Sequence, residues 1–304
     1  MAAVALSFLA AILFASASVL QQSIAAQEEA RGLSLIRRLL RRPRWLAGGA
    51  ADISGYGAEA AALAFGSILV VQPILATMLL FAIPLSAAFG GTRPRLREVA
   101  WAAVLTAGVV VFLVIGRPSA GLERAPLAHW LVAVAVVVPL VLLCIGPGAR
   151  RPGPRRALSL GVAAGLLFGV MAGLTKSVVY LLDLGFADLF TSWEPYALAA
   201  VGCAGLLLQQ SAYQAGALPL SLPAIAVLEP VTATAIGIGV FEESVRTSGA
   251  GWVLTGAAAI AMAGGLIALS RSDSAPSPQG PVKEQGRRRQ ASEHRAPRGR
   301  REPQ

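Results

Sequence analysis

Residues 218–241 read LPLSLPAIAVLEPVTATAIGIGVF, and this stretch decides the fold. About 20 consecutive apolar residues cross the hydrocarbon core of a bilayer, so the stretch predicts a transmembrane helix. Glu229 lies near its middle, where a carboxylate is costly to bury, and the adjacent Pro230 removes a backbone donor and loosens the helix. An acid beside a helix breaker at membrane depth is typical of a transporter binding site.

The composition extends this interpretation to the whole chain. Of the 304 residues, 55% are hydrophobic and 14% are charged, whereas soluble globular domains carry about 25% charged residues. We therefore expect an all-α polytopic membrane protein whose partners are the lipid bilayer and a small-molecule or cation substrate, with a homodimer left open. The net charge of +10 comes from loops and the tail, so the positive-inside rule explains it and nucleic acid is not expected.

Nine stretches of the sequence are expected to be transmembrane helices. They are 2–25, 45–64, 67–89, 98–116, 129–145, 157–182, 194–213, 218–241 and 249–270. Residues 28–44, rich in arginine and leucine, predict either a short basic amphipathic helix on the membrane surface or a solvated loop. Residues 271–304 are rich in Ser, Pro, Gln and Arg, which predicts a disordered basic cytoplasmic tail.

The basic residues predict the orientation. If the spans alternate in direction, one face of the membrane receives most of the basic residues. These are six arginines after the first span, three after the third, four after the fifth and nine basic residues in the tail. The opposite face receives Arg117, Arg124 and Arg246. Cytoplasmic segments are enriched in Lys and Arg, so we expect the N-terminus outside and the C-terminus inside, in the plasma membrane.

Weak internal similarity predicts a duplication. Residues 6–24 align with 160–178, and at nearly the same offset Gln72–Pro73 aligns with Glu229–Pro230. An odd helix between two four-helix blocks inverts the second block, as in the inverted-topology repeats of secondary transporters. The expected parts are a first repeat (1–116), a linking helix with its loops (117–156), a second repeat (157–270) and the tail (271–304).

Short motifs resemble the drug/metabolite transporter (DMT) superfamily of EamA-like proteins. They are AGALPLSL at 215–222, LEPV at 228–231 and FEE at 241–243. The nine-span layout, with WLAG at 45–48, AFGS at 64–67 and Gln72–Pro73, is also similar to NIPA-type magnesium transporters. Where that family would carry an acid and an amide in the second span, this chain has Tyr56 and Glu59. The resemblance implies a transporter of drugs, amino acids, metabolites or magnesium.

The candidate site is the polar set inside the predicted spans. Glu229 is expected to bind a proton or cation, although a neutral or paired packing acid is the alternative. Lys176 either pairs with Glu229 or Glu59, or extends to the membrane surface. The remaining members of the set are Asp52 and Glu59 on one helix face, Gln72 as a hydrogen-bonding counterpart of Glu229, and the helix breakers Pro73 and Pro230. Tyr56 and Trp193 are interpreted as interfacial or packing aromatics.

Enzymatic and cofactor chemistry is not expected. Cys144 and Cys203 fall within spans, and His129 and His294 lie at a span edge and in the tail. The glycines of residues 169–177 differ in spacing from a phosphate loop, so ATP is not indicated. The sequence therefore predicts a secondary transporter that works by alternating access, with proton or ion coupling. The alternatives are a NIPA-like magnesium transporter and a non-transporting membrane scaffold.

Overall fold

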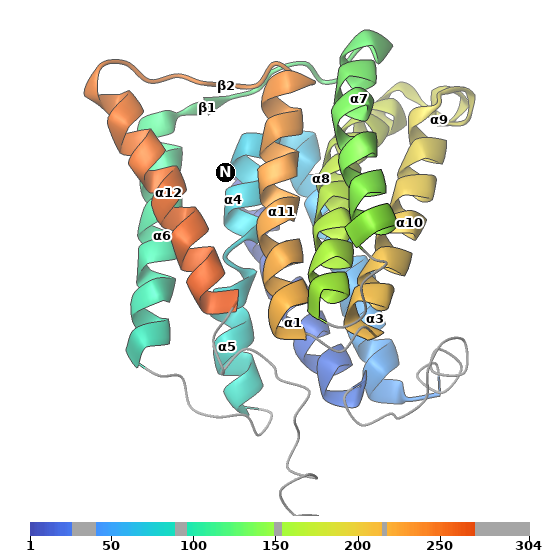
Figure 1. Cartoon of the computed structure of the whole chain (residues 1–304). Helices are drawn as coiled ribbons and strands as arrows, with labels where there is room; N and C mark the ends of the chain where they lie inside the picture. Colours follow the sequence, from blue (N-terminus) through green and yellow to red (C-terminus); the bar gives the residue numbers. More distant parts are fainter. Residues whose placement is uncertain (26–40, 89–95, 149–153, 215–217, 271–304) are drawn as a thin grey trace, which may run out of the picture.

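The protein is a helical bundle, which confirms the expected all-α class (Figure 1). The computed structural model describes residues 1–25, 41–88, 96–148, 154–214 and 218–270. The tail and most of the segment expected as a surface helix lie outside these residues. The helices are α1 (Ala2–Ala25), α3 (Pro43–Phe65), α4 (Ile68–Leu75), α5 (Met78–Ala88), α6 (Leu96–Gly116), α7 (Leu127–Leu143) with the π-helical turn η1 (Cys144–Gly148), α8 (Pro154–Leu184), α9 (Phe186–Thr191), α10 (Glu194–Gln214), α11 (Leu218–Gly239) and α12 (Ala250–Ser270).

The helices have the length and surface of a multi-pass membrane protein. Five segments are long and apolar enough to cross a membrane, in α1, α6, α7 with η1, α8 and α12. Large apolar side chains on α7 and α12 point out of the bundle, among them Val132, Val253 and Ile260. They would be costly to expose to water. Such a continuous apolar exterior is stable against lipid tails, so the bilayer is the partner of this surface.

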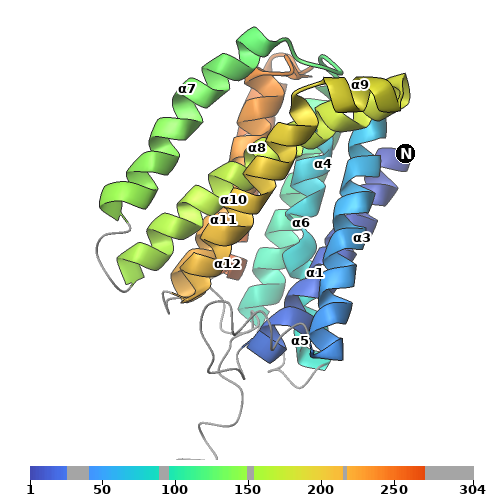
Figure 2. The ribbon, with the colours of Figure 1, turned by 90° about the vertical axis from the view of Figure 1, so that its right-hand side faces the viewer.

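Two helix groups and one helix pair form the bundle. In the first group α1 packs against α3, α4 and α5, and in the second α8 packs against α10 and α11. The helices α6 and α12 pack against each other at one edge (Figure 1), while α7 lies on the outside of the bundle, at the left of Figure 2. Three glycines of α8 face α11 so closely that an added Cβ would collide with it; they are Gly165, Gly169 and Gly173. Small residues at this spacing let two helices approach closely in a membrane.

The third predicted span is divided into two helices. Pro73 lies inside α4, where it removes one backbone donor, and the chain turns at Ala76 and Thr77 before α5 begins. The turn is held by Thr77, whose N–H and hydroxyl donate to the Ile74 carbonyl at 3.0 and 2.6 Å. By contrast, α11 continues as a helix through Pro230. Of the two helix breakers expected at the site, only Pro73 is followed by a break.

Loops join at one end of the bundle, which we call the β1–β2 end. Strand β1 (Pro118–Ser119) pairs antiparallel with β2 (Ser244–Val245), so the loop after α6 is tied to the loop after α11. At the same end, Arg124 donates to both carboxylate oxygens of buried Glu194 at 2.7 and 3.1 Å. These hydrogen bonds raise the pKa of the Arg124 guanidinium, so the cation persists at physiological pH. The described chain starts near this end and finishes at the other (Figure 1).

Candidate functional site

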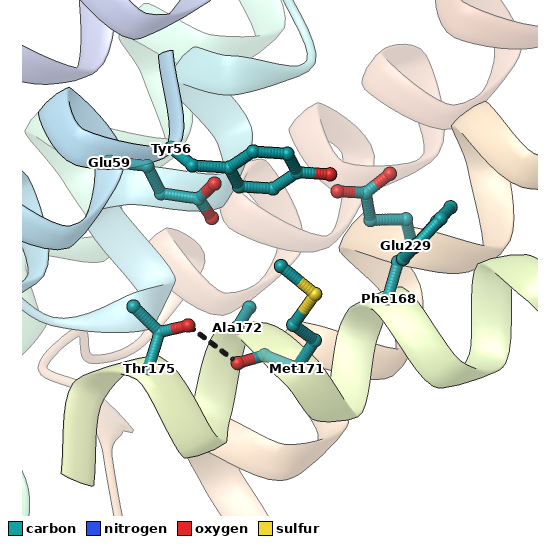
Figure 3. A pocket seen from close by; sticks show the side chains of 7 residues that line it. All are labelled: Tyr56, Glu59, Phe168, Met171, Ala172, Thr175 and Glu229. Carbon is teal, nitrogen blue, oxygen red and sulfur yellow. Dashed lines mark hydrogen bonds between the residues drawn. The ribbon is translucent and has the colours of Figure 1, made fainter. Parts of the chain in front are cut away.

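A small cavity lies between α3, α8 and α11. Its volume is about 10 Å³, close to the minimum needed to hold one water molecule. Two carboxyl groups and two hydroxyls supply its polar lining, and an apolar wall comes from α8. The lining residues are Tyr56, Glu59, Phe168, Met171, Ala172, Thr175 and Glu229 (Figure 3).

The two acids of the cavity come from helices that are far apart in the sequence. Glu59 belongs to α3 and is 5% exposed, whereas Glu229 belongs to α11 and is half-buried. The ring of Tyr56 lies between them, and its hydroxyl points toward the Glu229 carboxyl group (Figure 3). No basic side chain is among the lining residues, so the cavity is suited to a proton or a small cation.

Gln72 connects this cavity to the broken helix. Its side-chain amide donates a hydrogen bond to Glu59 Oε1 at 3.0 Å, and both side chains are buried. Gln72 sits one residue before Pro73, about one helical turn above the turn at Ala76 and Thr77. Discontinuous membrane helices commonly supply the binding sites of transporters because their interrupted backbone can move or coordinate ligand.

The oxygen atoms of the cavity are the groups that would meet a ligand. The Thr175 hydroxyl donates to the Met171 carbonyl at 2.8 Å, which leaves its oxygen lone pairs available toward the cavity. Among the residues that the structure describes, no cluster of three or more His, Cys, Asp or Glu side chains forms a metal site. A cation here would be held by two carboxylates and by hydroxyl or water oxygens.

Lys176 does not reach the cavity, so its expected pairing with Glu229 or Glu59 was wrong. Its ammonium lies 2.6 Å from Glu243 Oε1, with both side chains buried, and 4.6 Å from the ring centroid of Phe241. The expected alternative, an extension to the membrane surface, is also excluded because Lys176 is 7% exposed. Glu243 can attract the ammonium because its buried carboxylate lies within ion-pair distance of it, and the same carboxylate also accepts backbone N–H groups at the start of α4.

The remaining predictions concern Asp52 and the two aromatic residues, Tyr56 and Trp193. Asp52 is half-buried on α3, two turns from Glu59, and is not among the residues that line the cavity. Tyr56 packs edge-on against Phe14 at 4.9 Å between ring centroids, as expected for a packing aromatic, and it also lines the cavity. Trp193 packs edge-on against Trp130 at 5.8 Å between ring centroids, as expected for a packing aromatic.

Sequence reasoning missed the role of Glu243. The sequence placed this residue just after the predicted span 218–241 and outside the candidate site, whereas the structure buries it against the start of α4. The available signals were the acid directly after an apolar helix and the unmatched charge of Lys176. Neither signal shows which helix the loop with Glu243 contacts, because Lys176 and Glu243 are 67 positions apart in the sequence.

Comparison with known proteins finds a related chain in Corynebacterium glutamicum, described as an uncharacterized protein. The two are 36% identical over 286 residues, covering 89% of this chain and 98% of the relative. No family model matches the sequence, and no solved structure matches it.

Proposed function

This chain belongs to the same family as the uncharacterized C. glutamicum protein, and we propose that it is a secondary transporter. It would move a small molecule or cation across the plasma membrane by alternating access. The observation that carries the proposal is the meeting of Glu59 and Glu229 at one small cavity. Acids at membrane depth are expensive and usually mark ion pathways or proton relays.

We propose nine crossings of the membrane, arranged as two inverted repeats. Besides the five long apolar segments, these would be α11, the α4–α5 pair, α3 and α10. The last two contain 23 and 21 residues, enough to cross a bilayer despite their glycine and polar residues. The packing supports the duplication, because α8 contacts α10 and α11 as α1 contacts α3 and the α4–α5 pair. Helix α7 would be the link between the two repeats.

The proposed orientation places the β1–β2 end outside the cell. The described helix ends that flank the arginine-rich segments lie at the opposite end of the bundle (Figure 1). That end would face the cytoplasm under the positive-inside rule. The N-terminus would then be outside and the C-terminus inside.

The position of the cavity supports alternating access. Helix α3 belongs to the first proposed repeat, and α8 and α11 belong to the second, so a rocking motion between repeats would open the cavity to each side in turn. Two carboxylates in one small cavity repel each other when neither is neutralised. Binding of a proton and of a cationic substrate would therefore compete, which provides coupling.

A magnesium transporter is the second candidate, and the oxygen-rich lining favours it. Mg²⁺ prefers carboxylate, hydroxyl and water oxygens and keeps several of its waters. The cavity offers the Glu59 and Glu229 carboxylates with the Tyr56 and Thr175 hydroxyls. In the present conformation it holds about one water, so a hydrated ion would require the repeats to separate.

Reconstitution into proteoliposomes tests the proposal and separates the candidates. Flux of monovalent cations, Mg²⁺ and small organic cations is measured at two pH values, with and without an imposed proton gradient. Proton-driven flux of a solute supports the coupled transporter, and gradient-independent Mg²⁺ flux supports the magnesium path. Absence of flux for every solute, in protein that is folded and inserted, contradicts both.

A further inference from the structure

The N-terminus of α4 is capped by a side chain from a distant loop. The two oxygens of the Glu243 carboxylate accept the backbone N–H groups of Ile68 and Leu69, each at 2.9 Å. The first N–H groups of a helix lack internal partners and carry partial positive charge, so a carboxylate is a strong cap there. Lys176 holds the same carboxylate from the other side at 2.6 Å.

A second cap for the same helix is present but unused. Ser67 is the N-cap residue of α4 and has the extended backbone that suits this role, yet it makes no capping hydrogen bond. Its hydroxyl is buried and has no hydrogen-bond partner among the described residues. Serine is among the preferred N-cap residues, so a rotation of this side chain would satisfy one of the amides that Glu243 now occupies.

The two partners of Glu243 belong to different moving parts. Lys176 is on α8, in the same proposed repeat as Glu243, whereas Ile68 and Leu69 are on α4, in the other repeat. A rocking motion between repeats would therefore break the contact with the α4 amides and leave the ion pair with Lys176 intact. Glu243 would then keep a partner in both the closed and the open state. This matters because burying a carboxylate without a partner is strongly unfavourable in free energy.

This contact is directly connected to the cavity. One turn after Ile68, about 6 Å along α4, Gln72 donates its hydrogen bond to Glu59. On the other side, Lys176 follows Thr175, which lines the cavity. A change at the α4 cap would thus be transmitted to the cavity through one short helix.

We propose that Glu243 is a gate at the β1–β2 end, which closes by capping α4 and opens when Ser67 takes over the cap. Lys176 acts as a positioning residue that carries the Glu243 carboxylate in both states. The inference rests on the proposed transport function, because a gate needs a pathway. It names the contact that breaks on opening, between Glu243 and the α4 amides, and the group that replaces Glu243, the Ser67 hydroxyl.

Cysteine accessibility tests the gate without measuring transport. The background is Cys144→Ser with Cys203→Ser, and the reporter is Ala172→Cys, whose side chain lines the cavity. A membrane-impermeant methanethiosulfonate is applied separately to each face of oriented vesicles. Glu243→Gln removes the charged cap and should increase labelling from the β1–β2 face about tenfold or more. Ser67→Ala removes the replacement cap and should decrease that labelling.

Matched variants separate the gate from simpler explanations. Glu242→Gln makes the same change at the adjacent, exposed acid and should leave labelling unchanged. The double exchange Lys176→Glu with Glu243→Lys keeps an ion pair but places an ammonium on the α4 amides, so it should label as fast as Glu243→Gln. Gly237→Ala provides an uncharged test, because its added Cβ would lie 2.7 Å from Leu69 Cδ1 and 2.9 Å from Glu243 Oε2, and so would push α4 and the carboxylate apart.

The outcomes distinguish the gate from the transport function. Unchanged labelling in folded Glu243→Gln and Gly237→Ala would overturn the gate, even if proteoliposome flux is present. Wild-type labelling in the double exchange would also overturn it, since the ion pair alone would then close this end. If wild-type flux is absent but labelling follows the expected order, the Glu243 contact still controls access to the cavity from this end, and it is the transport proposal that fails.

Discussion

The Gln72 amide donates to the Glu59 carboxylate over 3.0 Å and so joins the broken helix α4 to α3 at the wall of the cavity. Gln72, which aligns with Glu229 in the proposed duplication, was expected to complete the polar lining by hydrogen bonding. In the structure its direct partner is Glu59, and Glu229 approaches from α11 on the other side of Tyr56 (Figure 3). The amide thereby fixes the position of one of the two acids on which the proposed function depends.

Replacing Gln72 should weaken both folding and transport. Gln72→Ala leaves the buried Glu59 carboxylate without its donor, which should cost about 1–3 kcal/mol of stability. The expected result is a lower melting temperature in detergent and a reduced flux. Gln209→Ala is the control, because this half-buried residue of α10 has no side-chain hydrogen bond to another residue that the structure describes. Equal melting temperatures for both variants would show that the Gln72–Glu59 bond is not formed.

Gly169 should be required for close packing of α8 against α11. In Gly169→Ala the new Cβ would lie 2.8 Å from both the Glu229 carbonyl and the Ala233 nitrogen. Overpacking of this kind typically costs about 1–3 kcal/mol, and here it would also displace Glu229. Gly256→Ala is the matched helix control, with no atom within 4 Å of the new Cβ. The melting temperature of Gly169→Ala should be lower than that of the wild type, and that of Gly256→Ala should be equal to it or slightly higher.

Arg124 should stabilise the β1–β2 end through its two bonds to Glu194. Arg124→Met leaves a carboxylate that is 1% exposed without its cation, at an expected cost of about 1–3 kcal/mol. Arg246→Met, at an exposed position of the same end, should have little effect. Limited proteolysis of the loops at this end, together with melting temperature, would measure the difference. Similar behaviour of both variants would contradict a structural role for the Arg124–Glu194 pair.

The helices were predictable because apolar length is a local property of the sequence. The expected span at 249–270, for example, agrees with α12 to within one residue at its start. The break after Pro73 was not predictable, since Pro230 follows a polar residue in the same way and yet α11 is continuous. In the structure the difference is the turn at Ala76 and Thr77 after α4, which the Thr77 hydroxyl closes with a hydrogen bond to the Ile74 carbonyl.

The two acids that line the cavity stood out in the sequence, whereas the partner of Lys176 did not. Glu59 and Glu229 stand out because ionisable residues are rare in apolar spans. Which of them Lys176 would meet could not be derived, because its actual partner comes from a loop whose path depends on the folded bundle. The contacts of Glu243 with Ile68 and Leu69 join residues that are 175 and 174 positions apart. Spacing and periodicity in the sequence do not predict contacts over such a separation.

Solute flux through Glu229→Gln, reconstituted beside the wild type, tests the central claim most directly. The substitution keeps the size of the side chain and removes its charge, and Glu123→Gln makes the same change at an exposed acid. With equal amounts of folded protein in the vesicles, wild type and Glu123→Gln should transport, and Glu229→Gln should show no flux above empty liposomes. Flux in Glu229→Gln equal to that of the wild type would contradict a transport site at this cavity.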